Sequence, residues 1–119
     1  VYRSVEANEP IATKLLKLKD MPTCIVAPDD YAALGVINAI RRQGLRVPED
    51  VSVAGYDGIS VAESNEPKIA TIKQDTDKIG YEAAKRLIDL IEHPMTTTLD
   101  NTYMKVKLVK GTSVKNMFE

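Results

Sequence analysis

Two stretches of the sequence decide the fold: TCIVAPDDYAALG at residues 23–35 and VSVAGYDG at residues 51–58. Each begins with a short apolar run and stops at aspartate, at Asp29 and Asp30 in the first stretch and at Asp57 in the second. Short apolar runs without polar alternation are typical of strands buried on both faces of a parallel sheet. In open α/β sheets, ligands bind outside the carboxyl ends of the strands. The three aspartates therefore predict a polar-ligand site at this edge of the sheet.

The rest of the chain predicts alternating helices and strands, with a helix beginning at Glu9-Pro10 before the first strand. The expected elements after that helix are a strand at 23–27, a helix to about 43, a strand at 51–56, a loop at 57–68, a strand at 69–74, a helix at 75–92, a strand at 103–109 and a fraying tail. This order predicts an α/β fold with a parallel sheet and right-handed crossovers. Because the loop at 57–68 holds no full helix, we expect the third strand to leave the first sheet.

Composition limits the function. The 119 residues suit one domain or part of a larger one, and 44% hydrophobic with 28% charged residues indicates a globular chain. A net charge of −1 provides no broad basic field for nucleic acid and no polybasic membrane patch. Cys24 lies inside an apolar run, so we expect a buried structural thiol and a reducing compartment rather than a reactive cysteine. No signal-peptide pattern appears at the start, and the start at Val1 without methionine predicts a fragment of a longer protein.

Three kinds of catalytic or metal site fit the sequence poorly. Receiver domains also place two acids after one strand and one after a later strand, but only 27 residues separate Asp30 from Asp57. A glycosidase needs two carboxylates across a cleft, and no second wall is evident. His93 is alone, and there is no Gly-rich phosphate loop or G-x-S-x-G turn. The sequence therefore predicts neither enzymatic activity nor a metal or cofactor.

Each candidate ligand residue also has a purely structural interpretation. Asp29 and Asp30 suit the N-cap and first turn of a helix, and Asp57 beside Gly58 suits a tight turn. Tyr31 and Tyr56 flank these acids. Such pairs occur in sugar sites, where a carboxylate accepts hydroxyl protons and an aromatic face packs on the ring, but the tyrosines equally suit packing at the sheet edge.

The chain resembles the effector-binding region of LacI/GalR-type transcription regulators. The motifs that carry the resemblance are PTCIVAPDDYAALGVINAIRRQGLRVPEDVSVAGYDG at 22–58, EPKIATIKQDTDKIGYEAAKRLIDLI at 66–91 and VKLVKGTSV at 106–114. Family members show P-T-A-[IL]-x-[AC]-x-[ND]-D-x-x-A-x-G, then G-[FY]-D, a [IV]-x-Q segment and a closing L-[VI]-x-R-x-S-[TV] strand. Two departures are Pro28 before the acids and Lys110 in place of the usual arginine.

The resemblance implies two α/β lobes of the periplasmic-binding-protein type, with a hinge and an effector cleft between them. Residues 1–72 and 103–116 are then expected in the C-terminal lobe, with residues 73–102 as a crossover segment and helix of the N-terminal lobe. The parallel-sheet, three-layer lobe is incomplete in this chain.

Family effector contacts map onto Asp29, Asp57 and Gln74, with Tyr31 and Tyr56 beside them, and Asp30 becomes the expected helix cap. The implied partner is a small-molecule effector, a sugar or related metabolite, in a cytoplasmic homodimer without membrane contact. DNA binding would require an N-terminal domain that this chain lacks. The alternative is a periplasmic or extracellular sugar-binding protein of the same fold.

Overall fold

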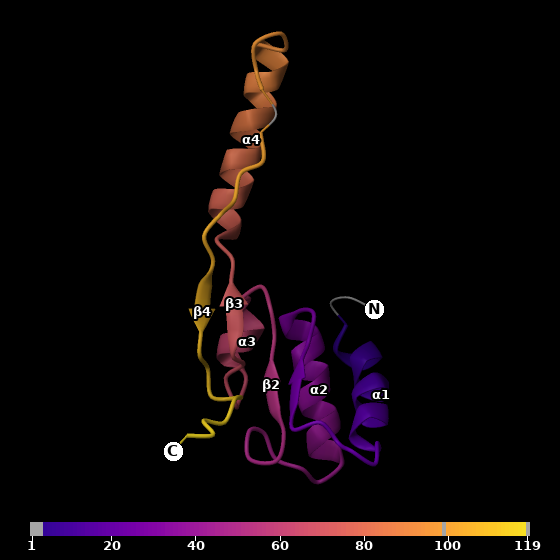
Figure 1. Cartoon of the computed structure of the whole chain (residues 1–119). Helices are drawn as coiled ribbons and strands as arrows, with labels where there is room; N and C mark the ends of the chain where they lie inside the picture. Colours follow the sequence, from indigo (N-terminus) through magenta and orange to yellow (C-terminus); the bar gives the residue numbers. More distant parts are fainter. Residues whose placement is uncertain (1–3, 99, 119) are drawn as a thin grey trace. The chain divides into compact units, whose positions relative to one another are not determined.

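The computed structural model describes residues 4–98 and 100–118, and it confirms a mixed α/β fold with a parallel strand pair (Figure 1). The elements in order are α1 (Val5–Leu16), β1 (Cys24–Val26), α2 (Asp30–Arg42), β2 (Ser52–Ala54), α3 (Ser60–Ser64), β3 (Thr71–Lys73), α4 (Thr76–Glu92) and β4 (Lys107–Val109). The chain divides into two compact units. The first unit runs to Lys73 and resumes at Lys107, and the second unit spans Gln74–Val106.

The strands of the first unit form two short ladders that meet at the carboxyl end of β2. β1 pairs with β2 in parallel, and β3 pairs with β4 in antiparallel orientation. Two parallel bridges, Ala54↔Ala70 and Asp57↔Lys73, join β2 and the residues after it to β3. β3 pairs with β4 and is also hydrogen-bonded to β2 and the residues after it, so the prediction that the third strand leaves the first sheet is wrong. The antiparallel β4 departs from the expected parallel sheet, because the chain re-enters the unit directly beside β3.

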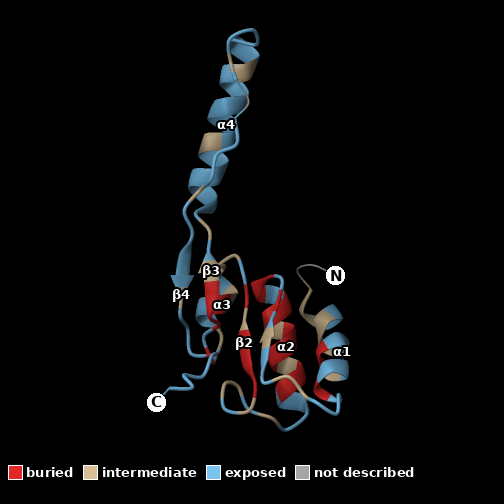
Figure 2. Ribbon diagram, viewed as in Figure 1, coloured by how far each residue is buried: buried red, intermediate tan, exposed pale blue. Residues whose placement is uncertain are grey.

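The core of the first unit lies where α2 covers the strands, and buried residues concentrate on α2, β2 and the start of β3 in Figure 2. Its largest fully buried apolar side chains are Ile37, Ile40, Val51, Val53 and Ile69. Helix α1 packs closely on α2 at Gly35, where an added Cβ would lie 2.4 Å from the Val5 carbonyl oxygen. A glycine is therefore needed at this helix crossing.

Helix α1 begins earlier than the sequence pattern suggested. The Ser4 side chain accepts a hydrogen bond from the Ala7 N–H and caps the helix, and Pro10 lies inside it. The predicted start at Glu9-Pro10 is therefore wrong, because the Ser4 cap starts the helix at Val5. Its buried residues are Ala12 and Leu16.

Two further predictions about burial are wrong. Cys24 is exposed and Val26 is 76% exposed, because helices cover only one face of β1 in this structure. The tail does not simply fray, because Ser113 is fully buried. Its hydroxyl donates to the Val53 carbonyl at 2.6 Å and accepts from the Ala70 N–H at 2.8 Å, which ties the tail between β2 and β3.

The second unit consists of α4 and the segment that follows it. Asp75 caps α4 by accepting from the Lys78 N–H, and the Thr97 hydroxyl beyond the helix donates to the Asp89 carbonyl at 3.0 Å. No described residue of α4 is buried, and its apolar side chains at Leu87, Ile88 and Ile91 are more than half exposed. Among the described residues no helix is long and apolar enough to cross a membrane.

Candidate functional site

Asp29 occupies the point where β1 gives way to α2. Its backbone is extended, at φ −154° and ψ 173°, and its Oδ1 accepts a hydrogen bond from the Ala32 N–H at 2.8 Å. Asp29 is therefore the N-cap of α2, and the prediction that Asp30 caps this helix is wrong. The cap falls one residue earlier because Asp30 already has helical geometry as the first residue of α2. An effector contact by Asp29 would have to coexist with this capping bond.

Asp30 instead ties together three segments that are distant in the sequence. Its side chain is completely buried. Oδ1 accepts a hydrogen bond from the Thr71 hydroxyl at 2.6 Å, and Oδ2 accepts one from the Ile59 N–H at 2.9 Å. We call Asp30, Ile59 and Thr71 the Asp30 junction. It joins the start of α2 to the loop after β2 and to the first residue of β3.

The loop that carries Asp57 is held directly against β3. Asp57 has φ 102°, a conformation that residues other than glycine rarely adopt. Its N–H donates to the Ile72 carbonyl at 3.0 Å. The next residue, Gly58, has φ 69°, and an added Cβ there would lie 2.5 Å from the Lys73 Cα. The turn interpretation of Asp57 is therefore correct for the backbone, while its side chain stays partly exposed.

The remaining predicted residues occupy different surroundings. Tyr31 and Tyr56 are 39% and 40% exposed, so part of each residue remains accessible to solvent. Gln74 is the first residue of the second unit. Its effector role stays a prediction from the resemblance. Register places Val26 of β1 opposite Ala54 of β2, so the segments carrying the aspartates and tyrosines follow neighbouring parallel strands.

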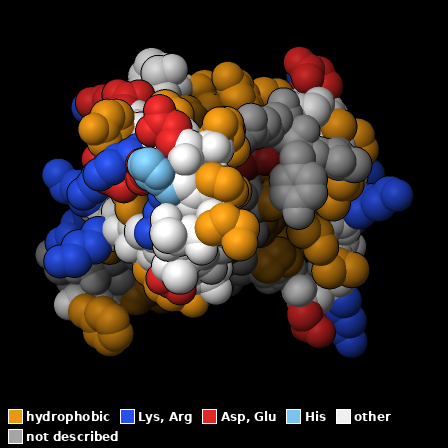
Figure 3. Space-filling view, turned by 90° about the horizontal axis from the view of Figure 1, so that it is seen from above, with side chains coloured by type: hydrophobic (Ala, Val, Ile, Leu, Met, Phe, Trp, Pro, Cys, Tyr) orange, Lys and Arg blue, Asp and Glu red, His pale blue; other side chains and the backbone are white. Residues whose placement is uncertain are grey.

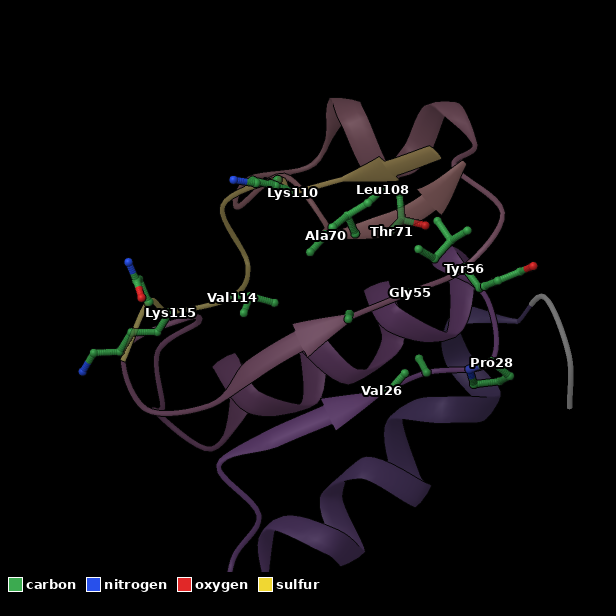
Figure 4. Close-up of a pocket in the computed structure, with 15 residues that line it drawn as sticks. Val26, Pro28, Gly55, Tyr56, Ala70, Thr71, Leu108, Lys110, Val114 and Lys115 are labelled. Carbon is green, nitrogen blue, oxygen red and sulfur yellow. The ribbon is translucent and has the colours of Figure 1, made fainter. Parts of the chain in front are cut away.

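A concavity of about 870 Å³ opens on the uncovered face of the first unit's strands. Figure 4 shows Pro28 and Tyr56 at one end of it, and Lys110, Val114 and Lys115 at the other. Of the predicted effector residues, Tyr56 is the one that contributes to its lining. The wall is mainly apolar, with Val26, Ala70 and Leu108 among its residues. The two candidate aspartates thus lie outside this concavity.

An ion pair fixes the connection that leads from α2 into β2. Both oxygens of Asp50 accept hydrogen bonds from the Arg46 guanidinium, at 2.9 Å each, and Oδ2 also accepts from the Arg46 N–H at 2.8 Å. The side-chain hydrogen bonds, followed by the backbone one, lower the pKa of Asp50 from 3.8 to about 2. In Figure 3, acidic and basic side chains are intermingled on the face shown, in keeping with the small net charge.

The sequence pattern indicated the strand ends, Asp30 and Gly58, but it did not indicate Thr71 or the role of Asp30 in tying segments together. Thr71 and Gly58 both constrain the Asp57 loop, and Asp30 connects it to α2. The signal for Gly58 was present in the Asp-Gly pair, which is typical of positive φ angles. No local pattern distinguishes a threonine that bonds a buried carboxylate from any other strand threonine.

The model of the periplasmic binding protein-like domain matches residues 1–114, so the chain belongs to this family of ligand-binding α/β domains. The resemblance to LacI/GalR-type regulators is confirmed by the relatives that the chain matches. The HTH-type transcriptional repressor CytR of Escherichia coli (strain K12) is 38% identical over 87 residues, which are 73% of this chain and 26% of CytR.

Two solved structures of LacI-family transcriptional regulators share the fold. The regulator from Arthrobacter sp. FB24 in complex with lactose has a TM-score of 0.83 at 32% identity, covering 94% of this chain and 42% of that one. The regulator from Enterococcus faecium with bound ribose has a TM-score of 0.84 at 31% identity, covering 93% of this chain and 40% of that one. The chain thus spans about a quarter of CytR and about two fifths of each solved regulator.

Proposed function

We propose that this chain is the C-terminal part of the effector-binding domain of a transcriptional regulator, and that its effector is a sugar or a related small metabolite. The observation that carries the proposal is the placement of Asp29 and Asp57 just beyond the ends of two neighbouring parallel strands in a chain of this family. Carboxylates at such an edge accept hydroxyl protons, and the aromatic faces of Tyr31 and Tyr56 suit the C–H side of a sugar ring. The lactose and ribose complexes of the similar regulators support this ligand class.

The division into two units supports the lobe assignment. The chain leaves the first unit after Lys73 and re-enters it at Lys107, close to the boundaries of the proposed C-terminal lobe at 1–72 and 103–116. Residues 73–102 would then cross into the N-terminal lobe and bring Gln74 to the cleft. Effector binding would shift the equilibrium between open and closed lobes, and so bias a DNA-binding domain outside this chain. We propose a cytoplasmic homodimer for the complete protein.

The alternatives are a sugar-binding protein outside the cytoplasm and an enzyme that uses the same sheet edge. The relatives favour the regulator, since CytR is a helix-turn-helix repressor and the two sugar complexes are of LacI-family regulators. We therefore propose binding without catalysis. A sugar consumed during incubation with the protein, in a manner abolished by Asp29→Asn, would support the enzyme instead.

The test is a calorimetric titration of the complete protein with the sugar that most raises its melting temperature. Asp57→Asn should weaken binding roughly tenfold or more, because a lost hydrogen bond to a charged group costs about 1.5–3 kcal/mol. Asparagine is chosen because it tolerates positive φ angles better than alanine. Asp20→Asn is the matched control, because Asp20 is exposed and precedes β1 rather than following it. Unchanged affinity in Asp57→Asn would remove Asp57 from the site.

A further inference from the structure

We infer that Asp30 is a positioning residue: its buried carboxylate holds the Asp57 loop against β3 and thereby sets the effector affinity without contacting the effector. The binding consequence rests on the proposed function. The structural consequence, a loop whose order depends on Asp30, does not.

The hydrogen bonds of the Asp30 junction define this role. Each carboxylate oxygen accepts one donor, the Thr71 hydroxyl at 2.6 Å and the Ile59 N–H at 2.9 Å. An ionised carboxylate only accepts hydrogen bonds, so its two oxygens match this pair of donors. Asp30 and Thr71 are almost fully buried, at 0% and 3% exposure, so water has little access to replace either bond. One side chain therefore fixes both the loop and the strand.

The backbone beside the junction is shaped around the carboxylate. An added Cβ at Gly55 would lie 2.4 Å from Asp30 Oδ1, so the carboxylate occupies the space that a side chain would need. Gly55 is the residue directly after β2, and its N–H donates to the Ala70 carbonyl at 2.8 Å. The close approach of β2, β3 and α2 at this point thus depends on the missing side chain of Gly55 and on the short side chain of Asp30.

The conformation of Asp57 explains why the loop needs this support. A non-glycine residue at φ 102° is held in a sparsely populated region, and such a residue keeps its geometry only when its surroundings enforce it. Two restraints lie on either side of it along the chain. The Asp57 N–H is bound to the Ile72 carbonyl, and the Ile59 N–H is bound to Asp30. Removing the bond from the Ile59 N–H to Asp30 therefore loosens the backbone on the C-terminal side of Asp57.

The first experiment measures the loop without any effector, by amide hydrogen exchange in the complete protein. Thr71→Val removes the hydroxyl while keeping the β-branched shape, and Thr71→Ser keeps the hydroxyl. Exchange at Ile59 should accelerate about tenfold or more in Thr71→Val and in Asp30→Asn, and should stay close to wild type in Thr71→Ser. Amides in the centre of α2 should be unaffected. Unchanged exchange at Ile59, or equal acceleration throughout the first unit, would overturn the inference.

The second experiment is a double-mutant cycle on effector affinity. If Asp30 acts by positioning Asp57, Thr71→Val should weaken binding several-fold in the wild type and have little further effect in Asp57→Asn. Losses that simply add would show that the junction does not act through Asp57, and would overturn the positioning role. A wild-type protein that binds no sugar would refute the proposed function, and the exchange measurement would then decide on Asp30 by itself.

Discussion

Ser113→Ala removes a single oxygen atom that joins the C-terminal tail to two strands. The hydroxyl donates to the Val53 carbonyl at 2.6 Å and accepts from the Ala70 N–H at 2.8 Å. Ser113 and Val53 are fully buried and Ala70 is 7% exposed. Alanine would therefore leave one backbone acceptor and one backbone donor without a partner in a place that water enters poorly.

The expected loss of stability follows from these two groups. Leaving a buried polar group unsatisfied costs about 1–3 kcal/mol, so the two together should lower the free energy of unfolding by roughly 2–6 kcal/mol. The substitution keeps both backbone hydrogen bonds of residue 113. The Ser113 N–H donates to the Lys68 carbonyl, and the Ser113 carbonyl accepts from the Val53 N–H. The tail should thus remain in place while the junction between β2 and β3 weakens.

The assay is equilibrium urea denaturation followed by circular dichroism, with Ser64→Ala as the control. Ser64 is exposed in α3, so its substitution should change the free energy of unfolding by less than about 0.5 kcal/mol. The midpoint for Ser113→Ala should fall while the urea slope is unchanged, because the surface exposed on unfolding is the same. A loss below about 1 kcal/mol, less than the cost of one unsatisfied group, would refute the reasoning.

Three further predictions concern stability. Gly35→Ala should destabilise the protein by about 1–3 kcal/mol, because the added Cβ meets the Val5 carbonyl, and a neutral or stabilising result in thermal unfolding would contradict the close helix contact. Gly80→Ala is its counterpart, because nothing lies within 4 Å of a Cβ there and α4 should gain roughly 0.5–1 kcal/mol of helix stability. Pairing with Arg46 lowers the pKa of Asp50 from 3.8 to about 2. The pair therefore stabilises the folded state fully at pH values above 3.8, and this contribution to stability is lost as the pH falls towards 2. The urea midpoints of wild type and Asp50→Asn should therefore differ at neutral pH and converge over that acid range, and a difference that persists below it would show that the pair is not the cause.

The sequence predicted those features that depend on local pattern. The short apolar runs before Asp29 and Asp57 are typical of buried strands. The alternating order of helices and strands then places the carboxyl ends of both strands at the same edge of the sheet. The capping residue was harder, because Asp29 and Asp30 have the same chemistry and only the backbone geometry after Pro28 decides which is outside the helix.

Burial could not be predicted where it depends on distant residues. Ser113 lies in a polar, irregular tail, and nothing near it in the sequence shows that Val53 and Ala70 need its hydroxyl. Cys24 lies in an apolar run but is exposed, because no helix among the described residues covers that face of its strand. In both cases the deciding contacts, or their absence, are long-range.

The antiparallel pairing of β3 with β4 brings together the two points where the chain leaves the first unit and re-enters it. Lys73 and Lys107, the residues at the unit boundary on the outgoing and returning strands, are register partners. Directly opposed like charges repel, and salt screens that repulsion. The pairing of β3 with β4 at Lys73 and Lys107 should therefore become more stable as ionic strength rises.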